Sequence, residues 1–248
     1  MDGTPLRQGP VRAGSAAAGA FRTLTIDRPE KANALDAATV DALLAGFEAA
    51  LPDGRPIAFM GEGKAFCGGF DFTGVEEQSQ GDLLLRFVRI ETLLQAVRHA
   101  PVVTIALVGG AAFGAGADLA ASCAYRIGSR ESRFRFPGFR FGVALGTRHL
   151  ARVVGPDAAR AILLENRTIG AEEALSLGLL THLVERSELE AEAEKIVAAH
   201  RGLPAQTAER LLALTGADTR DADMADLVRS VMPDGLHDRI ARYRNAGR

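Results

Sequence analysis

Apolar and polar positions follow two successive patterns along the chain. Between residues 21 and 184, short apolar or alternating runs typical of strands stand between longer runs of helical period. From residue 187 onward the period is helical throughout. This order predicts an α/β fold that ends in an all-helical region.

The predicted elements can be placed by residue. Strands are expected at Phe21–Ile26, Ile57–Met60, Pro101–Val108, Tyr125–Ile127, Phe134–Phe136 and Leu180–Val184. Helices are expected at 36–50 (capped by Asp36), 83–99, 115–124, 147–153, 157–164 and 171–177, and in the final region at 188–200, 205–215, 221–231 and 236–244. The polar stretch Gln78–Gly81 is expected to be a mobile loop.

A glycine-rich segment, Val108–Leu119, stands between a predicted strand and an Ala-rich helix. The first backbone N–H groups of a helix lack intrahelical acceptors, and the helix dipole adds partial positive charge there. Such a place suits an anion, or an oxygen that becomes one during a reaction. Asp118 follows within the first turn. The segment therefore predicts a backbone oxyanion hole with an acid/base candidate beside it, although an acid there could also simply cap the helix start.

A second glycine-rich loop, Gly61–Phe70, also follows a short apolar strand. Because both glycine-rich loops follow a strand in the same way, we expect the two units to stack in layers with both loops facing one cavity. Two converging N–H groups are what a thioester carbonyl needs when it becomes an enolate, and each can contribute about 2.7–4 kcal/mol in the transition state. The alternative is that these glycines only allow a strand and a helix to pack closely.

Other glycine-loop and catalytic motifs fit less well. A dinucleotide site needs G-x-G-x-x-G near the first strand, whereas this loop lies in mid-chain with the spacing G-x-x-x-G-x-G. The loop lacks the Gly-Lys-Ser/Thr ending of a phosphate-binding P-loop. The sequence has no G-x-S-x-G elbow of a serine hydrolase and no metal-ligand spacing, so no metal is expected.

Bulk composition fits one large domain, or one domain with a small C-terminal lobe. The 248 residues are 47% hydrophobic, and the net charge of −2 gives no reason to expect nucleic acid or an acidic membrane as partner. Cys67 and Cys123 lie in apolar, glycine-rich surroundings and are expected to be buried thiols in a reducing compartment. The sequence shows no apolar run of membrane-spanning length and no secretory signal, so a cytoplasmic protein is expected.

Several ordered motifs resemble the crotonase (enoyl-CoA hydratase/isomerase) superfamily. They are the segments Leu24–Leu35, Gly61–Asp71 and Pro101–Leu119, with a later run, Ile162–Leu180. Together they are specific for the superfamily but not for one of its reactions. The resemblance implies a spiral of ββα units at 21–190, an N-terminal extension or irregular first strand at 1–20, and a helical region at 191–248 for oligomerisation or a lid.

The resemblance also implies a substrate and its binding residues. The substrate would be an acyl-CoA thioester of fatty acid metabolism, with no cofactor beyond its own coenzyme A, and the assembly a homotrimer or hexamer. The oxyanion donors would be the backbone N–H groups of Phe70 and Ala115. The CoA groove would be lined by Lys31, Ala32, Gly68, Gly69, Phe70, Asp71, Phe72, Gly114 and Ala115. Arg28 and Lys31 are candidates for the CoA phosphates, or solvated turn charges.

The chain departs from the hydratases that it resembles at the catalytic acids. Their first glutamate lies three residues after the second oxyanion donor, where this chain has Asp118. Their second follows the proline of a Phe-x-x-Pro-Glu run, where this chain has Gly138. Glycine cannot transfer a proton, and a positioned acid or base contributes roughly 10²–10⁴-fold. Hydration by two glutamates is therefore not expected, and Gly138→Glu would raise it only in an otherwise preserved pocket.

Several activities remain open at this point. Asp118 could act alone as the base of an isomerase or orient a water. A decarboxylase or thioester hydrolase of the same superfamily needs the oxyanion site more than two acids. A non-catalytic protein that binds acyl-CoA is a further alternative. Arg140 and His149, near the shortened stretch 139–147, could replace the missing group, although structural roles are favoured for both.

Overall fold

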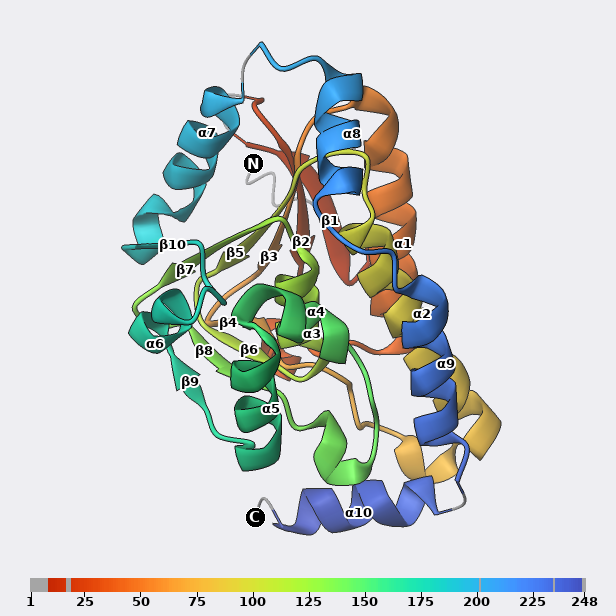
Figure 1. Ribbon diagram of the computed structural model, residues 1–248. Coiled ribbons are helices and arrows are strands. Elements are labelled where there is room, and N and C mark those ends of the chain that lie inside the picture. Colours follow the sequence, from red (N-terminus) through yellow and green to blue (C-terminus); the bar gives the residue numbers. More distant parts are fainter. Residues whose placement is uncertain (1–8, 17–18, 201, 234, 247–248) are drawn as a thin grey trace, which may run out of the picture.

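The computed structural model describes residues 9–16, 19–200, 202–233 and 235–246, and it contains two β-sheets surrounded by helices (Figure 1). The larger sheet has the order β1-β2-β3-β5-β7-β10 and is parallel except for β1. The smaller has the order β4-β6-β8-β9 and is parallel except for β9. The predicted α/β class is confirmed.

The elements have the following bounds. The strands are β1 Val11–Ser15, β2 Arg22–Ile26, β3 Ile57–Gly61, β4 Ala65–Cys67, β5 Thr104–Val108, β6 Ala111–Phe113, β7 Tyr125–Ser129, β8 Arg133–Arg135, β9 Ile169–Gly170 and β10 His182–Val184. The helices are α1 Ala37–Ala50, α2 Gln80–Arg98, α3 Ala115–Ser122, α4 Thr147–Val154, α5 Pro156–Glu165, α6 Ala171–Ser176, α7 Leu189–Ala199, α8 Ala205–Leu214, α9 Arg220–Val231 and α10 Leu236–Ala246. Short 3₁₀ turns include η3 Val75–Glu77 and η4 Gly138–Phe141.

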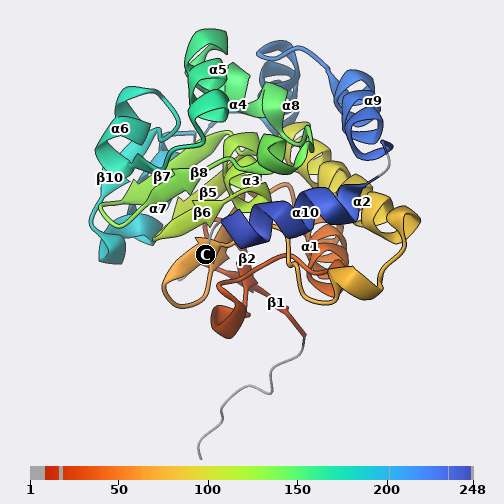
Figure 2. The ribbon, with the colours of Figure 1, turned by 90° about the horizontal axis from the view of Figure 1, so that it is seen from below.

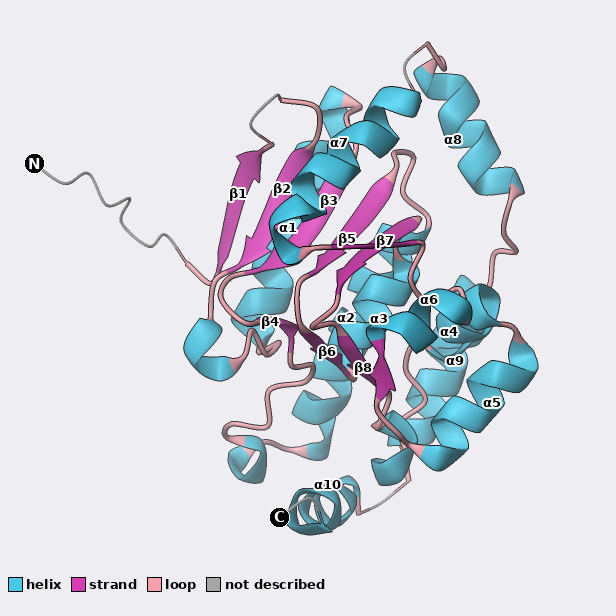
Figure 3. Ribbon diagram, turned by 90° about the vertical axis from the view of Figure 1, so that its left-hand side faces the viewer, coloured by secondary structure: helices cyan, strands magenta, loops and turns pink. Residues whose placement is uncertain are grey.

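Each central strand of the larger sheet continues into a strand of the smaller sheet. The pairs are β3 with β4, β5 with β6, and β7 with β8, and the first two pairs lead into helices α2 and α3. Figure 3 shows the two sheets one below the other. The chain therefore repeats ββα units, and the turns between the sheets and the helices come together on one side of the smaller sheet.

Burial on both faces of the sheet explains why the sequences of the central strands are unbroken apolar runs. All five residues of β5 are buried, and β5 lies between β3 and β7 in the parallel sheet. Cys67 and Cys123 are buried free thiols, and burial raises the pKa of each to about 12. The predicted buried thiols are therefore confirmed.

Three sequence predictions need correction. The loops at 61–70 and 109–116 each contain a strand, β4 and β6, and three residues are too few to show a period in the sequence. The segment Gln78–Gly81 is not a loop throughout, because helix α2 already begins at Gln80. Ser79 caps it in a capping box with Asp82, which the polar composition concealed.

The C-terminal helices pack on different parts of the α/β body. Helix α7 contacts β5 and β7, α9 contacts α2, and α10 contacts η4. Figure 2 shows α10 lying across the lower face. The boundary at residue 190 stays a prediction. In the predicted N-terminal extension, β1 pairs with β2, whereas residues 1–8 and 17–18 lie outside the described residues. No helix in the described ranges is both long and apolar enough to cross a membrane.

Candidate active site

A cavity of about 140 Å³ lies where the two glycine-rich loops meet, and we call it the acyl cavity after the acyl group that the sequence resemblance implies. Its lining includes predicted site residues from both loops and from the altered segment: Gly68, Phe70, Phe72, Gly114, Ala115, Asp118 and Gly138. Four more lining residues come from the shortened stretch 139–147: Phe139, Phe141, Val143 and Leu145. The sequence did not point to the others, which are mostly aromatic or aliphatic: Phe87, Phe113, Arg135, Phe136, Leu163 and Tyr243. The two loops thus face one largely apolar hollow, as the spacing predicts.

Backbone pairing determines the direction of the Phe70 amide. The Leu35 N–H donates to the carbonyl of Gly69 at 2.7 Å, and the Asp71 N–H donates to the carbonyl of Leu35 at 3.0 Å. In a parallel bridge these bonds use the two neighbours of the central residue, whose own N–H points to the opposite side of the strand. The Phe70 amide is therefore directed away from Leu35.

The second amide belongs to Ala115, the first residue of helix α3. As one of the first four N–H groups it has no acceptor within the helix. The preceding residue, Gly114, has φ +50° and donates its own N–H to the carbonyl of Arg135 at 2.8 Å, which fixes the turn. Gly114 and Ala115 line the same cavity as Phe70.

Gly69 brings the two loops together. It has φ +87°, and a Cβ atom there would lie 2.4 Å from the carbonyl oxygen of Phe113 and 3.3 Å from the amide nitrogen of Ala115. No side chain fits in that gap, so the glycine is required for close approach of the loops. Close packing and an oxyanion site are thus compatible interpretations of these glycines rather than exclusive ones.

The side chain of Phe70 is held from behind by helix α2. Its ring stacks on Phe87 with the centroids 4.5 Å apart, and the Arg86 guanidinium lies 4.0 Å from its centroid. A terminal nitrogen of Arg86 also donates to the carbonyl of Asp71 at 2.6 Å. Arg86 therefore fixes both the ring of Phe70 and the backbone directly after it.

Asp118 projects from the first turn of α3 into the acyl cavity and is only 5% exposed. Burial raises the pKa of its carboxyl well above the usual value, and the nearby Glu91 carboxyl raises it further. Such a group exists in the protonated form over a wider pH range than an ordinary aspartate. It can therefore donate a proton, and once ionised it is a stronger base.

Gly138 lines the cavity at the start of η4, and the turn leaves little room for a larger residue. A Cβ atom there would lie 2.8 Å from the carbonyl oxygen of Val143. Arg140 and His149, the two candidates to replace the missing acid, do not line the acyl cavity. Arg140 donates to the carbonyl of Leu164 at 2.8 Å, and the buried His149 has Nδ1 2.5 Å from Oγ of Ser122. Both side chains have structural partners, which favours the structural interpretation of each.

The other predicted groove residues lie outside the acyl cavity. Lys31 and Asp71 line a separate surface hollow together with Arg28. Arg28 forms ion pairs with Asp36 and Asp71 at 3.0 Å each, so its charge is already neutralised. Ala32 packs below Gly68, whose N–H donates to the Ala32 carbonyl at 2.8 Å.

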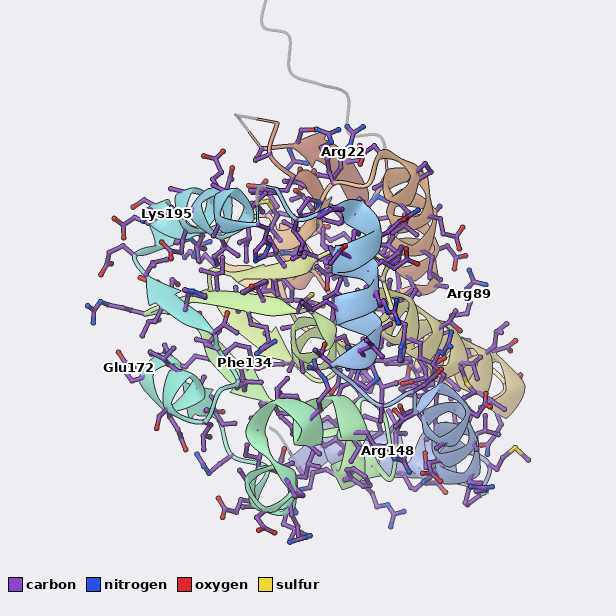
Figure 4. All side chains as sticks on the ribbon, turned by 45° about the horizontal axis from the view of Figure 1, so that its top comes forward. Arg22, Arg89, Phe134, Arg148, Glu172 and Lys195 are labelled. Atoms are coloured by element: carbon purple, nitrogen blue, oxygen red, sulfur yellow. The ribbon has the colours of Figure 1, made fainter. Side chains whose placement is uncertain are left out.

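Side chains of metal-binding type meet at another place, where atoms of Glu91, His149 and Asp223 lie within 4.8 Å of one another. Asp223 accepts hydrogen bonds from Arg148 at 2.8 Å and from the Thr219 hydroxyl at 2.5 Å. Although burial opposes the shift, hydrogen bonds from His149, Thr219 and Arg148 lower the pKa of Asp223 to about 2. Arg148 lies beside α9 in Figure 4 and supplies the positive charge, so the group forms an ionic network rather than a metal site.

Comparison with known proteins gives one family. The model for enoyl-CoA hydratase/isomerase matches residues 17–232. A "Probable enoyl-CoA hydratase" of Rhodobacter capsulatus is 39% identical over 165 residues, which make up 65% of this chain and 64% of that protein. Another of Mycobacterium bovis is 33% identical over 203 residues, 80% of this chain and 81% of that protein. A crystal structure of a Bordetella parapertussis protein described as enoyl-CoA hydratase/isomerase has a TM-score of 0.91 and 41% identity, and the match covers 95% of this chain and 98% of that one.

The repeated ββα units and the two loops at one apolar cavity define a protein of the crotonase fold, as the sequence resemblance predicts. The chain belongs to the enoyl-CoA hydratase/isomerase family.

Proposed function

We propose that the protein binds an acyl-CoA thioester with its acyl group in the acyl cavity and moves a proton on it through an enolate. The amides of Phe70 and Ala115 bind the thioester oxygen, and Asp118 transfers the proton. The observation that carries this proposal is that Asp118 is the one carboxyl lining the cavity within the described part of the chain. One acid/base group suits isomerisation of a double bond better than addition of water, which needs a second group to activate the water.

The proposed reaction balances with this one carboxyl. The carboxylate of Asp118 takes a proton from C2 of a 3-enoyl thioester, and the electron pair of the C–H bond moves onto the thioester oxygen. The two amides stabilise that oxygen, where each can contribute about 2.7–4 kcal/mol. The electron pair on the oxygen then re-forms the carbonyl, and the double bond moves to C2–C3. C4 takes the proton from the Asp118 carboxyl, and the product is the 2-enoyl thioester. The reaction needs no cofactor besides the coenzyme A of the substrate.

A second candidate is decarboxylation of an acyl-CoA that carries a carboxylate. The raised pKa of Asp118 favours it, because a protonated acid is present from the start. Loss of CO₂ leaves the electron pair on the thioester enolate, and Asp118 then protonates the α-carbon. This reaction uses the same amides and differs only in the group that leaves.

Two assays distinguish these activities. Isomerisation of a 3-enoyl-CoA is the expected activity, hydration of crotonyl-CoA is expected to be weak, and Asp118→Ala should abolish proton transfer while acyl-CoA still binds. Substantial hydration would contradict the one-acid mechanism. Binding of acyl-CoA without turnover of either thioester, or of a carboxylated one, would instead support a non-catalytic binding protein. An unchanged rate in Asp118→Ala would remove Asp118 from the mechanism.

We also infer self-association into a homotrimer or hexamer, as the resemblance implies. Support comes from α8 and its preceding loop, where Leu203, Leu211 and Leu214 are 44%, 51% and 76% exposed. Light scattering coupled to gel filtration should give a mass three or six times 26.2 kDa. A monomeric mass would contradict this inference without affecting the proposed chemistry.

A further inference from the structure

The acyl cavity leaves Asp118 with little contact with water. Its side chain is 5% exposed, and the cavity that it faces is walled by rings that include Phe70, Phe136 and Phe141. A bound acyl group would fill this space. A proton on Asp118 could then exchange with solvent only through another side of the residue.

A second carboxyl lies on that other side. Gly146 has φ +61°, and a Cβ atom there would lie 2.4 Å from Oδ1 of Asp118, so the glycine backbone packs directly against the carboxyl. The N–H of the same glycine faces the carboxyl of Glu91, and Nε2 of Gln95 donates to Oε1 of Glu91 at 3.0 Å. The carboxyls of Asp118 and Glu91 therefore flank one glycine, and helices α2 and α3, which carry them, pack together.

Glu91 connects this position to a second cavity of about 270 Å³. Glu91 itself is 1% exposed, yet it lines that cavity together with Asp223, Arg148 and Asp226. The side chains of Arg148 and Asp226 are each 42% exposed, so the second cavity reaches the surface. Arg148 belongs to α4 and lies beside α9 in Figure 4.

We propose that Asp118 exchanges its proton with solvent through Glu91 and the second cavity while substrate occupies the acyl cavity. This inference rests on the proposed function. When Asp118 is protonated, it passes its proton to the Glu91 carboxylate, and Glu91 gives that proton to a water in the second cavity. A proton from solvent returns by the reverse steps. Each transfer moves one proton between two oxygens, so no other reactant is needed. Glu91 is thus a positioning residue, because it acts through Asp118.

The charged groups around Glu91 come from three elements. Helix α3 contributes Asp118, α4 contributes His149 and Arg148, and α9 contributes Asp223. Burial raises the pKa of Glu91, His149 opposes this rise, and Asp223 adds to it. Both carboxyls therefore have raised pKa values, which suits exchange of one proton between them.

Isotope transfer during turnover tests the route. The 3-enoyl-CoA is isomerised in D₂O, and mass spectrometry measures deuterium at C4 of the 2-enoyl product. Wild-type protein should incorporate solvent deuterium there. Glu91→Gln should lower the incorporated fraction by at least roughly tenfold, because an amide cannot relay the proton. Glu91→Asp should restore part of it, and Asp226→Asn, at the outer wall of the second cavity, should match wild type. The fraction is measured on product formed, so a slower or less stable variant does not mimic the effect.

A second measurement does not depend on turnover. With a saturated acyl-CoA in the acyl cavity, the infrared carbonyl band of protonated Asp118, identified by its loss in Asp118→Asn, should shift on mixing with D₂O. The shift should be fast in wild type and slow in Glu91→Gln. A wild-type product that retains its original hydrogen at C4, or equal exchange in wild type and Glu91→Gln, would overturn the route. Absence of any isomerised product would instead contradict the proposed function, and the infrared exchange would then decide the route alone.

Discussion

The backbone of Gly146 packs against the carboxyl of Asp118, so that a Cβ atom on the glycine would lie 2.4 Å from Oδ1. Gly146 therefore forms part of the wall around the Asp118 carboxyl, and the same glycine directs its N–H to the carboxyl of Glu91. The stretch 139–147, which is short relative to the hydratases that the chain resembles, thus has a defined role. It supplies part of the wall behind the Asp118 carboxyl.

Gly146→Ala should displace Asp118 and strain the turn, because φ +61° is unfavourable for alanine. We expect proton transfer to fall by roughly 10- to 100-fold and the free energy of unfolding to fall by about 1–3 kcal/mol. Steady-state kinetics and denaturant unfolding measure the two effects. Gly170→Ala is the control, since a Cβ atom there meets nothing within 4 Å. Equal behaviour of the two variants would contradict the role of the Gly146 contact.

Gly138→Glu should fail to create a hydratase. Its Cβ atom would lie 2.8 Å from the Val143 carbonyl, so the backbone of η4 must shift before any new carboxyl could hold a water. We expect no gain in crotonyl-CoA hydration and a loss of about 1–3 kcal/mol in the free energy of unfolding. Gly81→Glu, where the nearest atom is 3.6 Å away, should be tolerated. A rise in hydration would show that η4 adapts and that the missing acid alone limits that reaction.

The pH dependence of stability should reveal the buried Asp118. Burial and the Glu91 carboxyl raise its folded pKa above the usual 3.8. Its contribution to stability is therefore complete below pH 3.8 and is lost as pH rises through the raised folded value. Asp118→Asn should flatten this loss, so the variant should gain stability relative to wild type as pH increases. Thermal unfolding across the pH range measures the difference.

An exposed aspartate provides the opposite control for that experiment. Hydrogen bonds from Arg55 lower the pKa of Asp53 to about 2. Its contribution is present above pH 3.8 and is lost as pH falls through about 2, so Asp53→Asn should flatten only the acidic side. A difference between Asp118→Asn and wild type that does not grow with pH would contradict a raised pKa for Asp118.

Arg86→Lys should weaken the oxyanion site without touching substrate. Lysine cannot both lie flat over the Phe70 ring and donate to the Asp71 carbonyl as the guanidinium does. We expect kcat to fall by roughly 10- to 100-fold through displacement of the Phe70 amide. Arg89→Lys, an exposed position on the same helix that is labelled in Figure 4, should keep wild-type kinetics. Equal kcat values in the two variants would show that Arg86 does not position the amide.

Local signals made much of the fold predictable. The Asp36 carboxylate accepts the Thr39 N–H at 2.8 Å and begins α1 where the capping pattern predicts. The apolar run before Gly109 became β5, one of the two central strands of the larger sheet and buried along its whole length. These features depend on neighbours within a few residues, so the sequence displays them directly.

The elements and residues that the sequence did not predict depend on contacts between segments far apart in the chain. Strands β4 and β6 exist because they pair with each other and because β6 also pairs with β8, not because three residues have a period. Glu91 lies on α2 and resembles any helical glutamate in sequence, yet folding places it near Asp118. The resemblance supplied the positions of Phe70, Ala115 and Asp118 and of several neighbours in the two loops, but it gave no sign of the residues of α2 beside them, such as Arg86 and Phe87.

Tyr243 belongs to the last helix, α10, and still forms part of the acyl cavity wall, 5.1 Å from Phe141 between ring centroids. The same helix ends in an ion pair between Arg244 and Glu76. Under the proposed function, selectivity for the length or bulk of the acyl group can therefore change through a helix that carries none of the three proposed reacting groups. Substitutions in α10 could then broaden or narrow the substrate range while Phe70, Ala115 and Asp118 stay unchanged.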